Sequence, residues 1–320
     1  MHTNAPYAVP IIMPPSGTIG ASTKEAAHIA RVKAAILRSA QNTLDNAGFT
    51  QVIAPTFTQM SGACGEPGTL IPVKLAGGNA FLRQTAQLHL EPLMRELGAV
   101  YSVGRSFRAE RKSDHRHLTE FTLIEGEVGG WTLDSLMSLM EEMIVSMVRR
   151  AGEIAPNHKP AALMATPFRR MTYDEAIVAL QGSGYFIEWG EDLAHVHEIA
   201  LTEMVGGPLF ITHYPAETRF FTMKICRQDP RVVECCDLLL PGVGEVMGAS
   251  ETETDPNVLE TRLYSSKAVR QAVDLGGSVQ DYEWYVQMRR TASDMQAGFG
   301  MGFERMVRYV CGLTSISQAI

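Results

Sequence analysis

Hydrophobic residues recur at helical spacing in two long stretches of the chain. The first, residues 22–47, places its apolar side chains on one face: Ile29, Val32, Ile36, Ala40 and Leu44. A capping box at residues 22–25 begins this helix, and Gly48 is of the type that ends one. The second, residues 132–150, has a methionine-rich face: Leu133, Leu136, Met140, Met143, Ile144 and Met147. Methionine-rich faces are typical of packed cores, so both helices are expected to lie against the interior.

Shorter patterns between and after these helices alternate between strand and helix. Strands are predicted near residues 49–55, 100–110, 118–128, 208–213, 219–225, 232–240 and 244–248, with a glycine-rich strand before residue 302. Helices are predicted at 85–97, 173–181, 192–205, 258–275, 279–290 and from about 302. Pro92 is expected to begin or kink the first of these. We therefore predict an α/β (α+β) fold with an extended arm over residues 1–21 and one domain over residues 22–320, including a small helical insertion at about 150–207.

The composition is that of an ordinary globular protein: of 320 residues, 45% are hydrophobic and 20% are charged. Asp plus Glu number 35 against 28 Lys plus Arg, and the resulting net charge of −7 disfavours a protein built around bulk attraction to nucleic acid. No apolar run is long enough to span a membrane, and no secretory signal is visible. The five cysteines, an odd count without paired metal spacing, favour free thiols. We expect a cytoplasmic protein that does not bind membranes.

The densest charge lies in the loop between the strands predicted near 100–110 and 118–128. From Arg105 to Arg116 there are five cationic and two acidic side chains, and His117 follows directly. Guanidinium groups donate paired hydrogen bonds to phosphate oxygens, each worth about 1.5–3 kcal/mol. Phe121 in the returning strand offers a ring on which a base stacks, worth about 1–3 kcal/mol. The pattern suits a clamp for a polyphosphate; a solvated hairpin tip is the alternative.

A second stretch with chemical potential is rich in glycine. Gly298, Gly300 and Gly302 recur at every second position, so one face of a strand has no side chains there and a flat ligand can lie on the backbone. Arg305, at the start of the following helix, adds a fixed charge. The alternative is a glycine strand packed under a helix.

A third stretch pairs two carboxylates around a turn. The Pro241-Gly242 turn brings Asp237 and Glu245 toward each other, and paired carboxylates that share phosphate oxygens suit Mg²⁺. Taken alone, this pattern also fits a surface turn.

In their order along the chain, these stretches resemble the catalytic domain of class II aminoacyl-tRNA synthetases, most closely the asparaginyl type. Gly48-Phe49 with Pro55 is similar to motif 1 of that family, residues 107–121 are similar to motif 2, and residues 298–305 to motif 3. The resemblance covers roughly residues 22–313. It implies an antiparallel sheet flanked by helices, and motif 1 implies a homodimer.

The resemblance also implies how ATP would be bound. Arg108 would hold the α-phosphate and the substrate carboxylate, Glu110 would face the adenine amino group, and Phe121 would stack on the ring. His117 and Arg305 would meet the γ-phosphate, so Arg108 and Arg305 are the candidate catalytic residues. The other ATP-binding candidates are Arg116, Leu118, Glu245 and Gly302.

The implied reaction is attack of an amino acid carboxylate on the α-phosphate of ATP, which gives an aminoacyl-adenylate and pyrophosphate. Asp237 and Glu245 would bind Mg²⁺ for this step. Such catalysis rests mostly on positioning and charge stabilisation, so it needs no nucleophilic side chain.

The amino acid pocket departs from the family pattern. Glu91 matches the asparaginyl glutamate that receives a side-chain amide, but Thr252 stands where the family has an arginine facing the substrate side chain. Loss of that cation beside Glu251 and Glu253 makes the neighbourhood more acidic. A buried aspartate carboxylate would then lack its partner, at a cost of several kcal/mol. We predict a substrate with a neutral or cationic side chain, such as asparagine or a diamino acid; the alternative is that Thr252 merely tolerates a relaxed pocket.

Four other residues complete the expected amino acid site. Glu66 and Glu125 are candidates for the substrate α-ammonium, and Gln87 and Gly298 are placed beside it by the resemblance. The two histidines at positions 195 and 197 do not share a helical face, so we expect them to be structural.

These inferences predict an ATP-dependent ligase that passes its acyl group to ammonia, an amine, a carrier or a protein. The resemblance begins near residue 22, which leaves no room for the family's N-terminal anticodon-binding domain, and the net charge is −7. We therefore do not expect charging of tRNA. The alternatives are an aspartate–ammonia ligase, a catalytically silent protein that binds ATP or an amino acid, and a minimal tRNA-charging enzyme.

Overall fold

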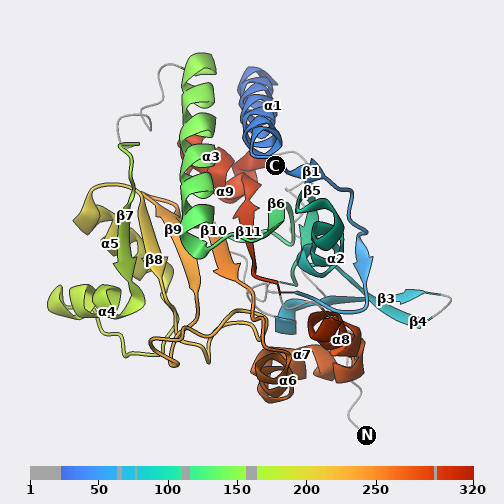
Figure 1. Ribbon diagram of the computed structural model, residues 1–320. Coiled ribbons are helices and arrows are strands. Elements are labelled where there is room, and N and C mark those ends of the chain that lie inside the picture. The colour runs from blue at the N-terminus through green and yellow to red at the C-terminus, as the bar shows by residue number, and fades with distance from the viewer. Residues whose placement is uncertain (1–22, 63–66, 76–77, 110–115, 156–163, 292–293) are drawn as a thin grey trace, which may run out of the picture.

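The computed structural model describes residues 23–62, 67–75, 78–109, 116–155, 164–291 and 294–320 (Figure 1). The predicted arm over residues 1–21 lies outside these ranges, as does the first residue of the predicted capping box. In the described part of the chain, no helix is both long and apolar enough to cross a membrane.

A mixed sheet of eight strands forms the centre of the molecule. Only its two outermost strand pairs are parallel, and all pairs between them are antiparallel. The expected antiparallel sheet flanked by helices is thereby confirmed. From one edge to the other, the strands are β1 (Thr50–Gln51), β5 (Ala99–Phe107), β6 (Glu120–Gly129), β11 (Gln296–Gly302), β10 (Gly244–Glu251), β9 (Cys235–Leu240), β8 (Leu209–Thr212) and β7 (Arg169–Thr172).

Three helices cover one face of this sheet: α1 (Thr23–Asn46), α3 (Leu133–Ile154) and α9 (Phe303–Cys311). Figure 1 shows α1 and α3 running side by side. The predicted apolar faces of both helices are buried in one hydrophobic core with Ile124 of β6 and with Ala297, Phe299 and Met301 of β11. Because side chains alternate along a strand, the three glycines that alternate with these β11 residues lie on the opposite face. That face carries the functional site.

The predicted insertion at about 150–207 contains β7, α4 (Tyr173–Gly182) and α5 (His195–Val205). Its helices pack on β8 and β9 around a second hydrophobic core, centred on Tyr173, Leu201 and Tyr214. The sequence pattern did not indicate β7, which has only four residues and pairs with β8 at the sheet edge.

The remaining elements pack near the open face of the sheet. They are α2 (Gln87–Leu97), α6 (Pro256–Ser265), α7 (Lys267–Asp274), α8 (Glu283–Thr291), the small sheet of β2 (Phe57–Thr58), β4 (Gly78–Leu82) and β3 (Ile71–Leu75), and the 3₁₀ turns Pro67–Thr69 and Val279–Tyr282. The last 3₁₀ turn, Ile316–Ala319, packs against α9 instead.

Three local predictions were wrong. The single helix expected over 258–275 is interrupted at Ser266, which has extended backbone angles. The Ser266 hydroxyl caps α7 by accepting a hydrogen bond from the backbone N–H of Val269. The strand expected over 219–225 is irregular, with isolated bridges at Met223 and Ile225. Pro92 lies inside α2 rather than at its start.

Candidate active site

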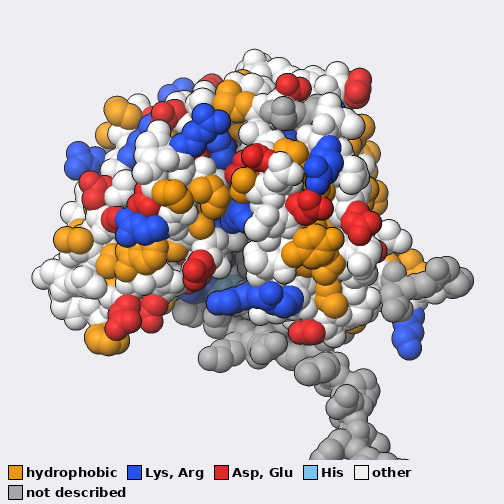
Figure 2. Space-filling view, turned by 60° about the horizontal axis from the view of Figure 1, so that its bottom comes forward, with side chains coloured by type: hydrophobic (Ala, Val, Ile, Leu, Met, Phe, Trp, Pro, Cys, Tyr) orange, Lys and Arg blue, Asp and Glu red, His pale blue; other side chains and the backbone are white. Residues whose placement is uncertain are grey.

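A cavity of about 1170 Å³ opens on the face of the sheet that α1, α3 and α9 leave uncovered. It exceeds the roughly 300–1,000 Å³ of ordinary small-molecule sites, which leaves room for two reactants. Its walls come from β6, β9, β10 and β11, from residues 216–230 and from α6 and α7. Figure 2 brings the bottom of the molecule forward and shows a hollow near the centre of this face, with acidic and basic side chains beside it.

The hairpin of β5 and β6 brings Arg108 and Phe121 together at one end of this cavity. Ser106 pairs with Phe121 in the strand register, and the backbone N–H of Arg108 donates to the carbonyl oxygen of Thr119 at 2.9 Å. The Arg108 guanidinium carbon lies 5.1 Å from the centre of the Phe121 ring. Arg108 Nε is buried and has no hydrogen-bond partner among the described residues. A flat aromatic surface and an available donor therefore face the same space.

Three more residues of the cationic loop line the cavity, namely Arg116, His117 and Leu118. Arg116 Nη2 lies 3.4 Å from Glu198 Oε2, which anchors the far side of the loop to α5. Glu110, the candidate for the adenine amino group, lies outside the described residues.

The glycine strand leaves bare backbone only along part of its length. Gly300 and Gly302 line the cavity, and a β-carbon on Gly300 would meet no described atom closer than 3.9 Å. A β-carbon on Gly298 would instead overlap the carboxylate of Glu127, which faces it in the register of β6 and β11. The flat surface expected from the sequence is thus confined to the end of the strand near Arg305.

Asp237 of β9 and Glu245 of β10 converge over Gly248. A β-carbon on Gly248 would lie 3.2 Å from Asp237 Oδ1 and 3.6 Å from Glu245 Oε1. The second oxygen of each carboxylate is held by an arginine: Arg219 lies 2.8 Å from Asp237 Oδ2, and Arg305 lies 3.1 Å from Glu245 Oε2. The arginines leave the other two oxygens directed at one recess above the glycine.

The electrostatics of this pair favour a cation in the recess. Burial and the neighbouring Glu245 raise the pKa of Asp237 to about 7, against the opposing effect of Arg219. Arg305 and Arg219 instead hold the pKa of Glu245 below its ordinary value despite its burial. Two carboxylate oxygens with residual like-charge repulsion fit Mg²⁺, which takes a few protein oxygens and shares the oxygens of phosphates.

At the other end of the cavity, Glu125 is fixed by the start of α2. Its two oxygens accept hydrogen bonds from the Thr85 hydroxyl and from the backbone N–H of Ala86, the latter at 2.9 Å. Burial raises the pKa of Glu125 despite these bonds. Gln87 lines the cavity beside it, whereas Glu66, the other candidate for the α-ammonium, lies outside the described residues.

Glu127 is a cavity residue to which the sequence analysis assigned no role. It lies two positions after Glu125 on the same face of β6, it is 4% exposed, and its Oε2 has no hydrogen-bond partner among the described residues. Burial, then the charge of Glu91, raises the pKa of Glu127 well above its ordinary value, and Arg289 offsets this only in part. Burial therefore favours the neutral form of Glu127, and a donor or cation placed beside Oε2 would favour its ionised form.

Glu91 itself does not line the cavity. Its carboxylate is fully buried and accepts bonds from Gln87 Nε2 at 2.9 Å, from the Tyr285 hydroxyl at 3.1 Å and from Arg289 of α8. Gln87, whose amide donates to Glu91, lines the cavity in its place, so contact of Glu91 with a substrate amide stays a prediction.

The departure at Thr252 is also set back from the cavity. Thr252 is buried, and its hydroxyl accepts a hydrogen bond from Gln296 Nε2 at 3.3 Å. Of the two acidic residues beside it, Glu251 pairs with Lys224 at 2.5 Å, and Glu253 accepts backbone N–H groups such as that of Ile225 at 3.2 Å. Glu251 and Glu253 therefore do not make the cavity acidic as expected; the acidic residues of β6 that line it are Glu125 and Glu127.

The two histidines of α5 have structural contacts. His195 Nδ1 lies 3.4 Å from Glu198 Oε2, and His197 Nδ1 accepts a backbone N–H at the start of the helix at 3.2 Å. Arg219, to which no role was assigned, stacks 3.8 Å above the Tyr214 ring while it holds Asp237. Because Arg219 lies in an irregular segment, no periodic pattern in the sequence indicated its place in the site.

The chain is similar in sequence to known proteins. A sequence model described as tRNA synthetases class II (D, K and N) matches residues 17–320. Asparagine–tRNA ligases of Roseiflexus sp. (strain RS-1) and Thermococcus kodakarensis are 35% and 36% identical to the chain, and the matches cover 91% and 92% of it. The same matches cover 67% and 68% of those two relatives.

Solved structures show the same kinship. The asparaginyl-tRNA synthetase of Pyrococcus horikoshii, complexed with asparaginyl-adenylate, superposes with a TM-score of 0.84 at 33% identity. That match covers 97% of this chain and 74% of the other. The Entamoeba histolytica asparaginyl-tRNA synthetase in complex with asparaginyl-adenylate gives a TM-score of 0.80 at 26% identity, over 92% of this chain and 66% of the other.

Proposed function

Because the chain belongs to the class II tRNA synthetases of the aspartyl, lysyl and asparaginyl group, we propose that it is an ATP-dependent ligase that activates an amino acid as an aminoacyl-adenylate. One observation carries the proposal. A single cavity joins Arg108 over Phe121 to the Asp237–Glu245 recess, with the bare backbone of Gly300 between the strands that hold them. This is the arrangement that a bent nucleotide and a carboxylate nucleophile require.

In this reaction, a carboxylate oxygen of the amino acid attacks the α-phosphorus of ATP. The bond from that phosphorus to the bridging oxygen breaks, and pyrophosphate leaves. Arg108 contacts both the α-phosphate and the attacking carboxylate, so it stabilises the charge that develops between them. Phe121 stacks on adenine, and His117 and Arg305 contact the γ-phosphate.

Mg²⁺ would be held by the free oxygens of Asp237 and Glu245, and it would neutralise charge on the phosphates. Arg219 and Arg305 keep the second oxygen of each carboxylate occupied, so they orient the pair toward the recess. Removal of either arginine would let its carboxylate rotate away from the shared position.

The amino acid would lie along β6. Glu125 would bind its α-ammonium, and Glu127 would meet the end of its side chain. Two positions on one face of a strand are about 6.8 Å apart, which matches the reach of a long diamino acid such as ornithine or lysine. A side-chain ammonium is the donor that the unpaired Oε2 of Glu127 lacks.

The same carboxylate argues against aspartate. The side chain of aspartate would place a third carboxylate beside Glu125 and Glu127, both of which are buried and have a raised pKa. Asparagine could donate its amide to Glu127, so it is the next candidate. The cost of an uncompensated buried charge makes an aspartate–ammonia ligase the less favourable assignment.

For the acceptor, we propose ammonia, an amine, a carrier or a protein rather than tRNA. A net charge of −7 gives no general attraction to a polyanion of that size. The competing candidate is the reaction named for the relatives, ligation of asparagine to tRNA, and it is favoured by their identity of about 35% to this chain.

We also propose a homodimer formed through the motif 1 region. Ile53, which follows the edge strand β1, is 95% exposed, and Phe57 of β2 is 47% exposed. Apolar side chains beside an edge strand are a favourable surface for a second copy. We place the enzyme in the cytoplasm, since the described cysteines Cys226, Cys235, Cys236 and Cys311 are free thiols.

The experiment is amino-acid-dependent exchange of pyrophosphate into ATP, measured over a panel that includes ornithine, lysine, asparagine and aspartate. We expect exchange with a diamino acid and its loss in Arg305→Ala. Exchange with aspartate alone would overturn the pocket assignment, and absence of exchange with every amino acid despite ATP binding would overturn the enzyme assignment. Acylation of bulk tRNA by the wild-type protein would favour the reaction of the relatives.

A further inference from the structure

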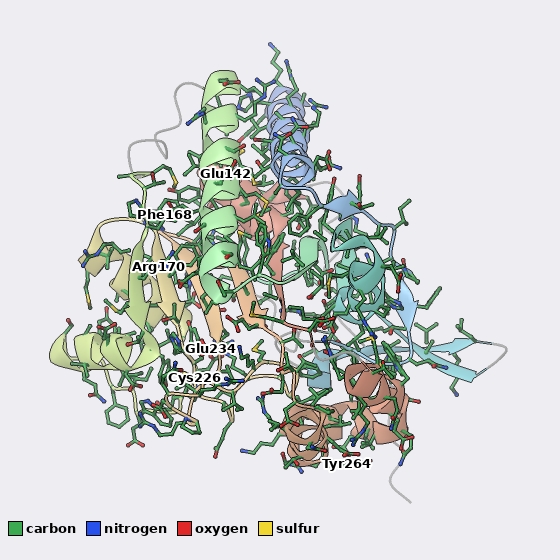
Figure 3. All side chains as sticks on the ribbon, viewed as in Figure 1. Glu142, Phe168, Arg170, Cys226, Glu234 and Tyr264 are labelled. Atoms are coloured by element: carbon green, nitrogen blue, oxygen red, sulfur yellow. The ribbon has the colours of Figure 1, made fainter. Side chains whose placement is uncertain are left out.

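The connection between β8 and β9, residues 213–234, carries a cluster of metal-binding side chains that does not line the cavity. His213 begins this connection, Cys226 lies within it and Glu234 ends it. One ligand atom from each lies within 4.8 Å of those of the other two. Cys226 and Glu234 are close neighbours at the start of β9 in Figure 3.

The backbone and a neighbouring hydroxyl fix His213. It is the one non-glycine residue with a positive φ (60°) in the described part of the chain, and its N–H donates to the carbonyl of Cys235 at 2.9 Å. Its Nδ1 lies 2.9 Å from Thr212 Oγ1, and its Nε2 lies 3.2 Å from Glu234 Oε2. A partner on one ring nitrogen that orients the other is the usual arrangement for a metal-binding histidine.

Glu234 supplies the negative charge at the cluster itself, 3.2 Å from the His213 ring. Asp134 and Glu251 also act on His213, and each of them is paired with a cation, Arg170 at 2.7 Å and Lys224 at 2.5 Å. Cys226 is buried, so a metal ion would be shielded from water on the sulfur side.

We infer that His213, Cys226 and Glu234 bind a divalent transition-metal ion of the zinc class. Zinc lies about 2.0–2.2 Å from histidine nitrogen and carboxylate oxygen, so two such ligands at a tetrahedral angle are about 3.4 Å apart. The observed 3.2 Å between His213 Nε2 and Glu234 Oε2 fits this separation. A thiolate ligand selects zinc-class ions over Mg²⁺ and Ca²⁺, and a water molecule would complete the tetrahedron.

The ion would tie both ends of the 213–234 connection to its interior. This segment supplies Arg219, Phe220 and Phe221 to the cavity wall, so the metal would hold that wall against the sheet. Its role would therefore be structural, and it stands or falls independently of the reaction catalysed in the cavity.

The test uses the full-length, untagged protein, freed of metal by a chelator and kept reduced. Titration with Co²⁺ is followed by absorption, because a thiolate–cobalt bond gives a charge-transfer band and tetrahedral cobalt gives intense visible bands. Zn²⁺ affinity is then measured by calorimetry. Cys226→Ser removes the thiolate, and His213→Asn removes the imidazole with a residue that tolerates positive φ. Cys311→Ser, at a buried free thiol on α9, is the matched control.

We expect one Co²⁺ per chain with a charge-transfer band in the wild-type protein and in Cys311→Ser. The band should be lost in Cys226→Ser, and Zn²⁺ should bind at least tenfold more weakly to both cluster variants. Zn²⁺ should also raise the melting temperature of the wild-type protein more than that of Cys226→Ser. A wild-type protein without the band, or a band that persists in Cys226→Ser, would overturn the assignment, and circular dichroism will show whether each variant is folded.

Discussion

Replacement of Glu127 by glutamine tests the pocket assignment, because it should change activity and stability in opposite directions. The variant keeps the size of the side chain and removes its charge. Oε2 of Glu127 has no partner among the described residues, and the side chain is 4% exposed. A substrate ammonium would therefore form a buried, charge-assisted pair with it.

Loss of one member of such a pair costs about 2–5 kcal/mol, which corresponds to about thirtyfold to several-thousandfold in kcat/KM. The open cavity of about 1170 Å³ admits water beside Glu127, so we expect a value near the lower limit. The assay is pyrophosphate exchange with ornithine or lysine, compared with asparagine, whose neutral amide should lose much less.

The free energy of unfolding should rise in the same variant. Burial, then the charge of Glu91, raises the pKa of Glu127 in the folded protein, so ionisation of this group opposes folding once the pH exceeds the pKa of an unfolded glutamate. At neutral pH, removal of the buried negative charge and its desolvation cost should stabilise the protein by about 1–3 kcal/mol. Glu203→Gln, at an exposed position on α5, should change neither quantity. Equal losses with all amino acids, or unchanged use of diamino acids, would refute the reasoning.

Three further predictions concern the phosphates, the metal pair and the dimer. Arg108→Ala should lower kcat/KM for pyrophosphate exchange by about 10²–10³-fold. The melting temperature should change little, because Arg108 Nε has no hydrogen-bond partner in the described protein. A large fall in melting temperature together with the loss of activity would contradict this. Mg²⁺-dependent ATP binding, measured by calorimetry, should strengthen as the pH rises through about 7 and then level off, because Mg²⁺ needs the ionised form of Asp237, whose pKa is about 7. The Asp237→Asn variant should bind ATP weakly at every pH. An affinity of the wild-type protein that does not change with pH would count against Mg²⁺ binding by Asp237 and Glu245. Ile53→Asp should shift the mass in solution from dimer toward monomer, whereas Val178→Asp, at an exposed position on α4, should not. A monomeric mass for the wild-type protein would refute the proposed dimer interface at the motif 1 region.

The sequence indicated those elements whose stabilising contacts are local or periodic. The apolar faces of α1 and α3 repeat over many turns, so both helices could be predicted, as could β11 from its alternating glycines. The interruption at Ser266 has no glycine or proline to mark it, and only the packing of α6 and α7 as separate helices reveals it. A strand as short as β7 is set by its parallel pairing with β8, which no local pattern contains.

The candidate site likewise combines residues that are close in sequence, which could be predicted to meet, with residues that are far apart in sequence, which could not. Arg108 and Phe121 belong to one hairpin, and Asp237 and Glu245 to another, so short-range reasoning could bring each pair together. The pairing of Glu91 with Arg289, by contrast, joins residues 198 positions apart. The importance of Glu127 likewise depends on a missing partner, which a sequence does not reveal.

The most direct measurement is the trapping of the activated intermediate. The protein is incubated with ATP, Mg²⁺, ornithine or lysine, and hydroxylamine, and the products are identified by mass spectrometry. The account predicts the hydroxamate of the diamino acid, with AMP and pyrophosphate formed in equal amounts. Formation of ADP, or ATP that is bound but left intact with every amino acid offered, would contradict it.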